Sequence, residues 1–307
     1  MMETLIAIVI ATLGAGTPLV FAALGELVNE KSGVLNLGVE GMMLVGAVCG
    51  FAVAAESGNP WLGVVASMAA GMGMAAIFGM LSLGFQANQV AAGLALTIFG
   101  VGTSAYIGLD YTSETITGIG PLPIRLLSEL PFVGPALFLL DQLLYLSLLL
   151  FVAINWFLYR TRAGLLLRGI GESPESAHAI GYPVIRIRFM AVLFGGAMAG
   201  LGGGYLALVY TPLWVEGMTA GRGWIALALV VFATWRPARV LLGAYLFGGI
   251  TILQFHIQGL GVELPSQLLS ALPYLATILT LVVISRNPAT IRLHSPASLG
   301  KPYHPAS

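Results

Sequence analysis

The sequence predicts an all-α membrane protein, a polytopic transmembrane bundle of about nine helices with a range of eight to ten. Three observations carry this prediction. Of 307 residues, 58% are hydrophobic and only 8% are charged, and the mean hydropathy is +0.93. An ordinary soluble domain is about 25% charged, so these few charges cannot cover a water-facing surface. Apolar runs of membrane-spanning length recur along the chain, and 40 glycines are roughly twice the average share of about 7%.

A bilayer core about 30 Å thick requires about 20 apolar residues in each spanning helix. The segment 224–235 is short for a crossing and is interpreted as a possible half of a broken helix. We expect residues 1–290 to form the membrane domain and 291–307, which is rich in proline, to form a short cytoplasmic tail. The predicted segments cover roughly residues 4–24, 33–55, 61–84, 89–109, 142–159, 189–211, 224–235, 239–258 and 271–285.

Basic residues orient the bundle, because loops on the cytoplasmic side collect lysine and arginine. With the N-terminus outside, the inner loops hold eleven of the thirteen basic residues, and the outer loops keep only Arg125 and Arg222. This asymmetry predicts a cytoplasmic C-terminus and supports an odd number of crossings.

Two connections are long. The outer one, about 110–141, contains four prolines and could form a surface lip. The inner one, about 160–188, contains a predicted short helix with serine at its N-cap, proline at its first position, glutamate in its first turn and glycine as its stop. Such a helix is too short to be stable alone, so it needs either a partner surface or the lipid headgroups. Its residues are Ser173, Pro174, Glu175, Ser176, Ala177, His178 and Gly181.

Small residues recur four apart in two segments. Gly196, Gly200 and Gly204 form one row, and the range 71–79 contains a second row of Gly, Ala and Gly. Rows of this kind let helix backbones approach closely in lipid, so we interpret them as helix-packing faces. They name no function.

Several function classes lack their residues. A phosphate-binding P-loop requires Gly-Lys-Ser/Thr, but the two lysines, Lys31 and Lys301, stand in other contexts. The four histidines form no helical pair, and Cys49 has no second cysteine with which to form a disulfide or a zinc cluster. Balanced charge gives no indication of nucleic-acid binding. We expect no metal or cofactor to be bound by this chain.

Glu40 is the charged residue that the apolar pattern explains least. It lies about seven residues, roughly 10 Å, into the second predicted segment, where a carboxylate is costly and faces the bundle interior or a water-filled cavity. Asn36, one turn earlier, would share its face. The pair is either part of a translocation or gating pathway or, as we favour, a structural group at a break in the helix. Asn88 and Gln89, at an inner helix mouth, are candidates for the same pathway, although an interfacial role is the simpler interpretation.

Three stretches resemble a known family. Residues 33–47 (GVLNLGVEGMMLVGA), the ordered matches within 161–204 and the range 217–228 (GMTAGRGWIALA) are similar to permease subunits of bacterial ABC importers. The relevant branch handles nucleosides and simple sugars and is related to the branched-chain amino-acid permeases. Those relatives usually carry an Ala-Gln-Gly-type sequence where this chain has Gly-Val-Glu-Gly at 38–41, which favours the nucleoside and sugar branch.

The resemblance implies that the helix within 173–181 is a coupling helix that docks into a separate ATPase subunit. ATP and Mg would bind in that partner, and this chain would be a transport subunit rather than an enzyme. An extracytoplasmic binding protein would deliver substrate near residues 110–141 and 212–223. A second permease subunit, non-identical in many family members, would complete the pathway in the bacterial cytoplasmic (inner) membrane.

Three alternatives stay open at this point. The chain could be a permease for branched-chain amino acids, or an ion-coupled secondary transporter with Glu40 as its protonatable group. A membrane-embedded enzyme ranks last because no paired catalytic side chains are apparent. The sequence does not identify the substrate.

Overall fold

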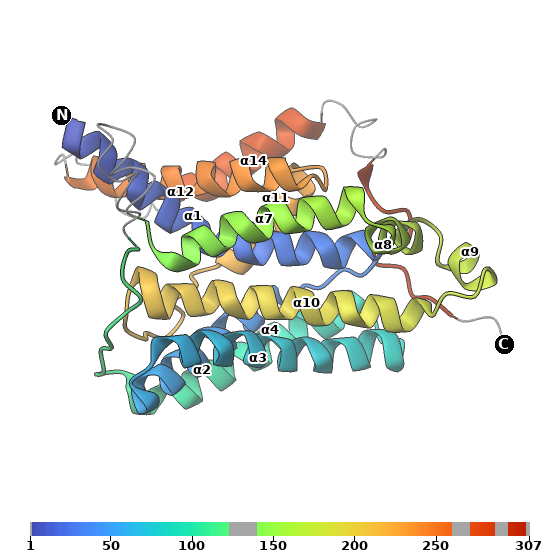
Figure 1. Cartoon of the computed structure of the whole chain (residues 1–307), viewed down its shortest axis with the longest axis horizontal. Helices are drawn as coiled ribbons and strands as arrows, with labels where there is room; N and C mark the ends of the chain where they lie inside the picture. Colours follow the sequence, from blue (N-terminus) through green and yellow to red (C-terminus); the bar gives the residue numbers. More distant parts are fainter. Residues whose placement is uncertain (1, 123–139, 260–270, 286–293, 305–307) are drawn as a thin grey trace.

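The computed structural model describes residues 2–122, 140–259, 271–285 and 294–304. Its helices run side by side along the long axis of the molecule (Figure 1). In these ranges the β-type pairing consists of two isolated bridges, Thr115 with Leu213 and Pro121 with Asp141. The predicted all-α class is confirmed.

Seven helices in the described ranges are long and apolar enough to cross a membrane. Two shorter apolar helices, α11 (Arg222–Phe232) and α14 (Leu272–Ser285), occupy the other two predicted segments. The polytopic bundle is therefore confirmed, with seven full-length spans. They are α1 (Met2–Lys31), α2 (Val39–Ser57), α3 (Pro60–Gly79) with η1 (Met80–Gly84), α4 (Gln89–Gly108) with η2 (Leu109–Tyr111), α7 (Gln142–Arg160), α10 (Val184–Tyr205) with η3 (Leu206–Tyr210), and α12 (Pro237–Gly259).

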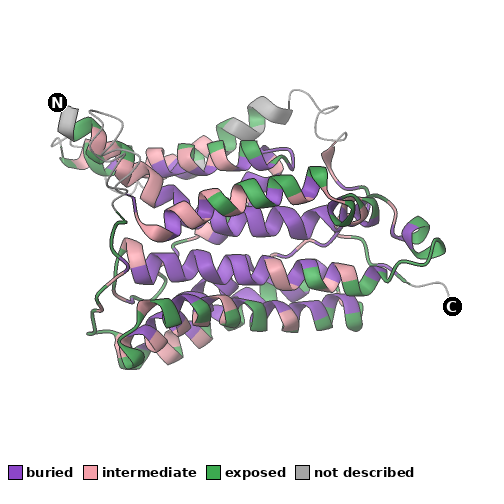
Figure 2. Cartoon of the chain, viewed as in Figure 1, coloured by how far each residue is buried: buried purple, intermediate pink, exposed green. Residues whose placement is uncertain are grey.

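The spans divide into helices that are buried at the centre of the bundle and helices that lie at its surface. In its most apolar stretch α10 is 83% buried and α2 is 78% buried, whereas the corresponding figure for both α7 and α12 is 28%. Figure 2 shows the same contrast between the purple length of α10 and the green outer face of α7. The hydrophobic face of α7 is therefore left for lipid or another protein, while α10 and α2 form the core.

The glycine row of α10 lies where this helix crosses α3. A Cβ atom built on Gly196 or Gly200 would overlap backbone atoms of α3, and one on Gly204 would overlap the Ser67 side chain. The second row contributes from the other side, because a Cβ on Gly71 would overlap α10 in turn. The two rows thus face each other, and their backbones are in direct contact.

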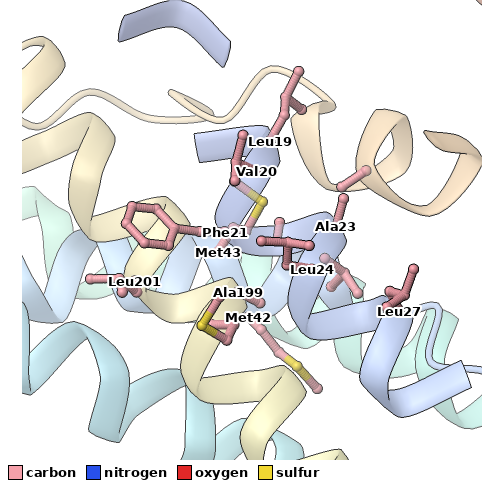
Figure 3. Packing of buried hydrophobic residues seen from close by; sticks show 14 of the residues in the cluster. Leu19, Val20, Phe21, Ala23, Leu24, Leu27, Met42, Met43, Ala199 and Leu201 are labelled. Atoms are coloured by element: carbon pink, nitrogen blue, oxygen red, sulfur yellow. The ribbon is translucent and has the colours of Figure 1, made fainter. Parts of the chain in front are cut away.

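Large buried side chains of α1, α2 and α10 pack against one another on the other side of α10. Figure 3 shows Phe21 and Leu24 of α1 beside Met42 and Met43 of α2 and Leu201 of α10. All of these side chains are buried. The unbranched methionines adapt to irregular gaps between helices, so one apolar cluster runs through α1, α2 and α10.

The second predicted segment, 33–55, differs from the structure in its first part. Helix α2 begins only at Val39, and residues 32–38 form turns and irregular chain against α4. Close packing explains the path: a Cβ on Gly93 of α4 would lie 2.7 Å from the Leu37 amide nitrogen. Hydropathy indicates that a segment is buried but does not distinguish a helix from irregular chain. The predicted helix therefore starts too early, at residue 33 instead of Val39. The prediction that Asn36 shares a helical face with Glu40 is wrong for the same reason.

Two further helices, α8 (Arg162–Glu172) and α9 (Pro174–Ala179), lie at one end of the bundle. Figure 1 places them at the same end as the C-terminus and opposite the N-terminus. The short helix predicted within 173–181 is present as α9, but α8 before it was not predicted.

Candidate functional site

Glu40 lies in the first turn of α2 and is 6% exposed. Its carboxylate accepts hydrogen bonds from the Thr219 hydroxyl at 2.6 Å, the Gly221 amide at 2.9 Å and the Gly223 amide at 2.6 Å. Both carboxylate oxygens are therefore occupied by groups at the start of α11. Because the first amides of a helix have no partners within it, Glu40 acts as a cap supplied by another helix.

Charge and space both favour this arrangement. A helix N-terminus carries a partial positive charge that stabilises a nearby carboxylate, and α11 has no side-chain cap of its own. A Cβ on Gly223 would come within 2.6 Å of Glu40 atoms, so only glycine permits the approach. The short predicted segment 224–235 is occupied by α11, and Glu40 joins the start of this helix to the start of α2 inside the bundle.

Asn36 and Gln89 serve the irregular segment 32–38. The Asn36 side chain accepts the Gly38 amide at 2.9 Å and donates to the Met42 sulfur at 3.4 Å. Gln89 accepts the Leu35 amide at 2.8 Å. These side chains supply partners for the backbone that helix formation would otherwise satisfy. Neither residue hydrogen-bonds to Glu40.

Asn88 lies apart from this cluster. Its side chain is exposed and accepts the Ala91 amide at 3.0 Å, which caps the start of α4. Gln89, its neighbour, is buried and leaves its amide nitrogen without a partner among the described residues. The four candidate pathway residues therefore separate into the Glu40 cap, the supports of segment 32–38 and a helix cap at the surface.

Two buried acidic residues of α1 escaped the sequence analysis. Glu26 accepts the Asn36 amide at 3.1 Å, and Glu30 accepts the indole N–H of Trp235, which follows α11. Both are 1% exposed. Four-residue spacing places them on one face of α1, and this signal could have shown that the C-terminal end of α1 faces protein rather than lipid.

The two loops predicted to receive substrate, 110–141 and 212–223, contact each other at the end of the bundle opposite α8 and α9. The Ile116 amide donates to the Pro212 carbonyl at 3.2 Å, and the Ile119 amide donates to the Leu208 carbonyl at 3.0 Å. The rest of the first loop, 123–139, lies outside the described residues. The loop 212–223 contains Thr219, whose hydroxyl donates to Glu40. It therefore connects this end of the bundle with the Glu40 cap.

Helix α9 has the local chemistry that the sequence predicts. The Ser173 hydroxyl accepts the Ser176 amide at 3.3 Å, Pro174 occupies the first turn, and Gly181 has φ +92° after the helix. Pro174 and Ala177 pack inward, whereas Glu175, Ser176 and His178 are exposed. Figure 2 shows this helix projecting from the bundle with a largely exposed surface.

Hydrophobic groups extend the exposed face of α9. Ile180 is 73% exposed and Tyr182 is 42% exposed. A hollow of about 520 Å³ lies beside them, lined by His178, Tyr303 and the first turns of α10. Exposed apolar side chains next to a hollow are typical of a protein-binding surface.

Comparison with known proteins gives a consistent result. Residues 8–284 match the family described as branched-chain amino acid transport system / permease component. A Haloferax volcanii protein named "Putative glucose ABC transporter permease protein" is 44% identical, over 96% of both chains. A guanosine ABC transporter permease of Bacillus subtilis is 32% identical over 96% of both chains. A nucleoside ABC transporter permease of Lactococcus lactis is 30% identical over 92% of this chain and 93% of its own.

Proposed function

The chain belongs to the ABC permease family whose model covers residues 8–284, and from this premise we propose that it imports a nucleoside or a simple sugar. The observation that carries the substrate class is the near full-length similarity to a sugar permease and to two nucleoside permeases. It is a multi-pass membrane protein. In this proposal it is a transport subunit of the cytoplasmic membrane with α9 and the C-terminus on the cytoplasmic side, and it has no catalytic site of its own.

The partners follow from the same proposal. ATPase subunits dock on α9 and its exposed neighbour Ile180, and they bind and hydrolyse ATP with Mg²⁺. An extracytoplasmic binding protein delivers substrate near the loops 110–141 and 212–223. A second permease subunit, which we propose to be non-identical, completes the pathway.

In the proposed mechanism the ATPases move the helix bundle as a rigid body by displacing α9 at one end of it. Closure of the ATPases displaces α9, which is joined to the bundle through α8 and α10. The direct backbone contact between α10 and α3 makes these helices move together, as alternating access between two rigid bodies requires. The starts of α2 and α11 meet at Glu40, so this joint moves with the bundle or opens as a unit.

An ion-coupled mechanism through Glu40 finds no support in its surroundings. Three donors already hold both oxygens of the carboxylate. A group that must gain and lose a proton in each cycle would have to break this helix cap.

Transport in membrane vesicles tests the proposal. Vesicles containing this chain, its ATPase partners and its binding protein are loaded with ATP in the absence of an ion gradient. Uptake of radiolabelled glucose and of radiolabelled guanosine is then measured separately. We expect one of them to accumulate only when ATP is present. Uptake that needs an ion gradient and continues without ATP would contradict the proposal.

A further inference from the structure

The end of the described chain, residues 294–304, crosses the α8–α9 end of the bundle instead of leaving it. The Lys31 side chain donates to the His294 carbonyl at 2.8 Å. The Ser298 amide donates to the Gly171 carbonyl at 3.0 Å, and the Gly300 amide donates to the Gly33 carbonyl at 3.3 Å. This tail, red in Figure 1, therefore ties the end of α1 to the end of α8.

Arg188 lies beneath the tail and is fully buried. Its Nε donates to the Ser32 carbonyl at 2.9 Å, and its Nη2 donates to the Ser298 hydroxyl at 2.8 Å. That hydroxyl in turn donates to the Gly171 carbonyl at 2.6 Å. One guanidinium and one hydroxyl thus join α10, the end of α1, the end of α8 and the tail.

The four segments meet without spare room. A side chain on Gly33, whose φ is +92°, would overlap Ser298 and approach Arg188 Nη2 to 2.6 Å. A Cβ on Gly171 would overlap the Lys31 carbonyl. A relative shift of any one segment therefore has to move the others.

The contact links the loop that carries α9 to the irregular segment 32–38. Gly171 and Arg188 lie on either side of α9, so the tail holds both ends of the loop that carries this helix. Ser32 and Gly33 begin the irregular segment that runs to Glu40. The backbone of that segment is held further on by Glu26, Gln89 and Thr97.

We propose that Arg188 is a positioning residue for transport, and that Ser298 completes its clamp. This clamp is the set of hydrogen bonds that Arg188 and Ser298 make with the Ser32 and Gly171 carbonyls and with each other. It transmits displacement of α9 to residues 32–38 and thereby to the joint at Glu40. A contiguous network of packed and hydrogen-bonded groups is the physical means for such transmission. The inference rests on the proposed docking role of α9, but the structural part can be tested without any partner.

The first test is hydrogen exchange on the full chain in lipid nanodiscs. Ser298→Ala removes the hydroxyl that accepts from Arg188 and leaves that buried nitrogen unpaired. We expect exchange of peptides covering 32–38 to accelerate about tenfold, the effect of losing one charge-assisted hydrogen bond. Ser295→Ala is the matched control, because it makes the same chemical change in the same tail at a half-buried residue that is not part of the Arg188–Ser298–Gly171 contact. Equal exchange in both variants would overturn the clamp.

The second test measures transport per ATP hydrolysed in the vesicles described above. For Ser298→Ala and for Arg188→Lys, which keeps the charge but loses the planar fork, we expect ATP hydrolysis to continue and uptake per ATP to fall about tenfold. A merely structural role would lower both in proportion, and a wild-type ratio in both variants would overturn the inference. If wild-type vesicles show no ATP-dependent uptake, the proposed function fails, and hydrogen exchange still decides whether the clamp exists.

Discussion

The Glu40 joint and helix α9 differ in how completely their groups are satisfied. At the joint, both oxygens of a buried carboxylate accept hydrogen bonds from one hydroxyl and two amides at the start of α11. At α9, a helix of six residues presents charged, polar and apolar side chains to the surroundings. A satisfied buried network is rigid, whereas a short exposed helix gains stability from a partner. The difference supports the proposal that the joint moves as a body and that α9 receives another protein.

The strongest way to break this comparison is to remove the carboxylate. In Glu40→Ala two amides and a hydroxyl lose their buried acceptor, and we expect the free energy of unfolding to fall by about 3–5 kcal/mol. Glu40→Gln, which keeps one acceptor oxygen, should lose less. Thermal unfolding in detergent measures the effect, with the exposed Glu216→Ala as control. Wild-type stability for Glu40→Ala would show that the joint is not a structural cap.

A second change tests whether the core moves as one body. Gly200→Ala places a methyl group against the Ser67 carbonyl of α3, and such overpacking costs about 1–3 kcal/mol. Gly73→Ala is the matched control because a Cβ there meets nothing within 4 Å. Melting temperatures of the two variants should differ, with Gly200→Ala the lower. Identical temperatures would mean that α10 and α3 separate at little cost.

The smallest expected effect concerns the turn after α9. Gly181 has φ +92° and open space around it, so Gly181→Ala introduces backbone strain of about 1–2 kcal/mol without a clash. We expect affinity for the ATPase to fall by up to about tenfold, and the free energy of unfolding of the chain to fall by no more than this strain. Gly169→Ala makes the same chemical change within α8, where a Cβ also meets nothing, and should bind as the wild type does. Equal affinity of both variants for the ATPase would show that the turn at Gly181 does not contribute to docking.

Local chemistry was predictable from the sequence and long-range contacts were not. The cap at Ser173 and the stop at Gly181 follow from residues that lie within one turn of each other, and the structure has both. The glycine rows were likewise visible as spacing. The partners of Glu40 lie about 180 residues away, and nothing in the apolar pattern marks Gly221 and Gly223 as its donors.

Two further features eluded prediction for related reasons. Residues 32–38 include Val34, Leu35 and Leu37 and lead directly into the apolar helix α2, and buried irregular chain cannot be told from buried helix by hydropathy alone. The tail reads as polar and rich in proline, yet Ser298 is buried because its partners, Arg188 and Gly171, come from distant segments. Composition predicts which segments are long and apolar enough to span a membrane, but it does not predict which backbone groups need partners.

Co-purification of the ATPase with variants of Ile180 tests the central claim most directly. Ile180 is 73% exposed beside α9, and Leu109 is 67% exposed at the opposite end of the bundle. Ile180→Glu should leave the melting temperature of the chain unchanged and lower recovery of the ATPase at least about tenfold, while Leu109→Glu should recover it as the wild type does. Full recovery with Ile180→Glu, or loss with Leu109→Glu alone, would contradict docking at α9.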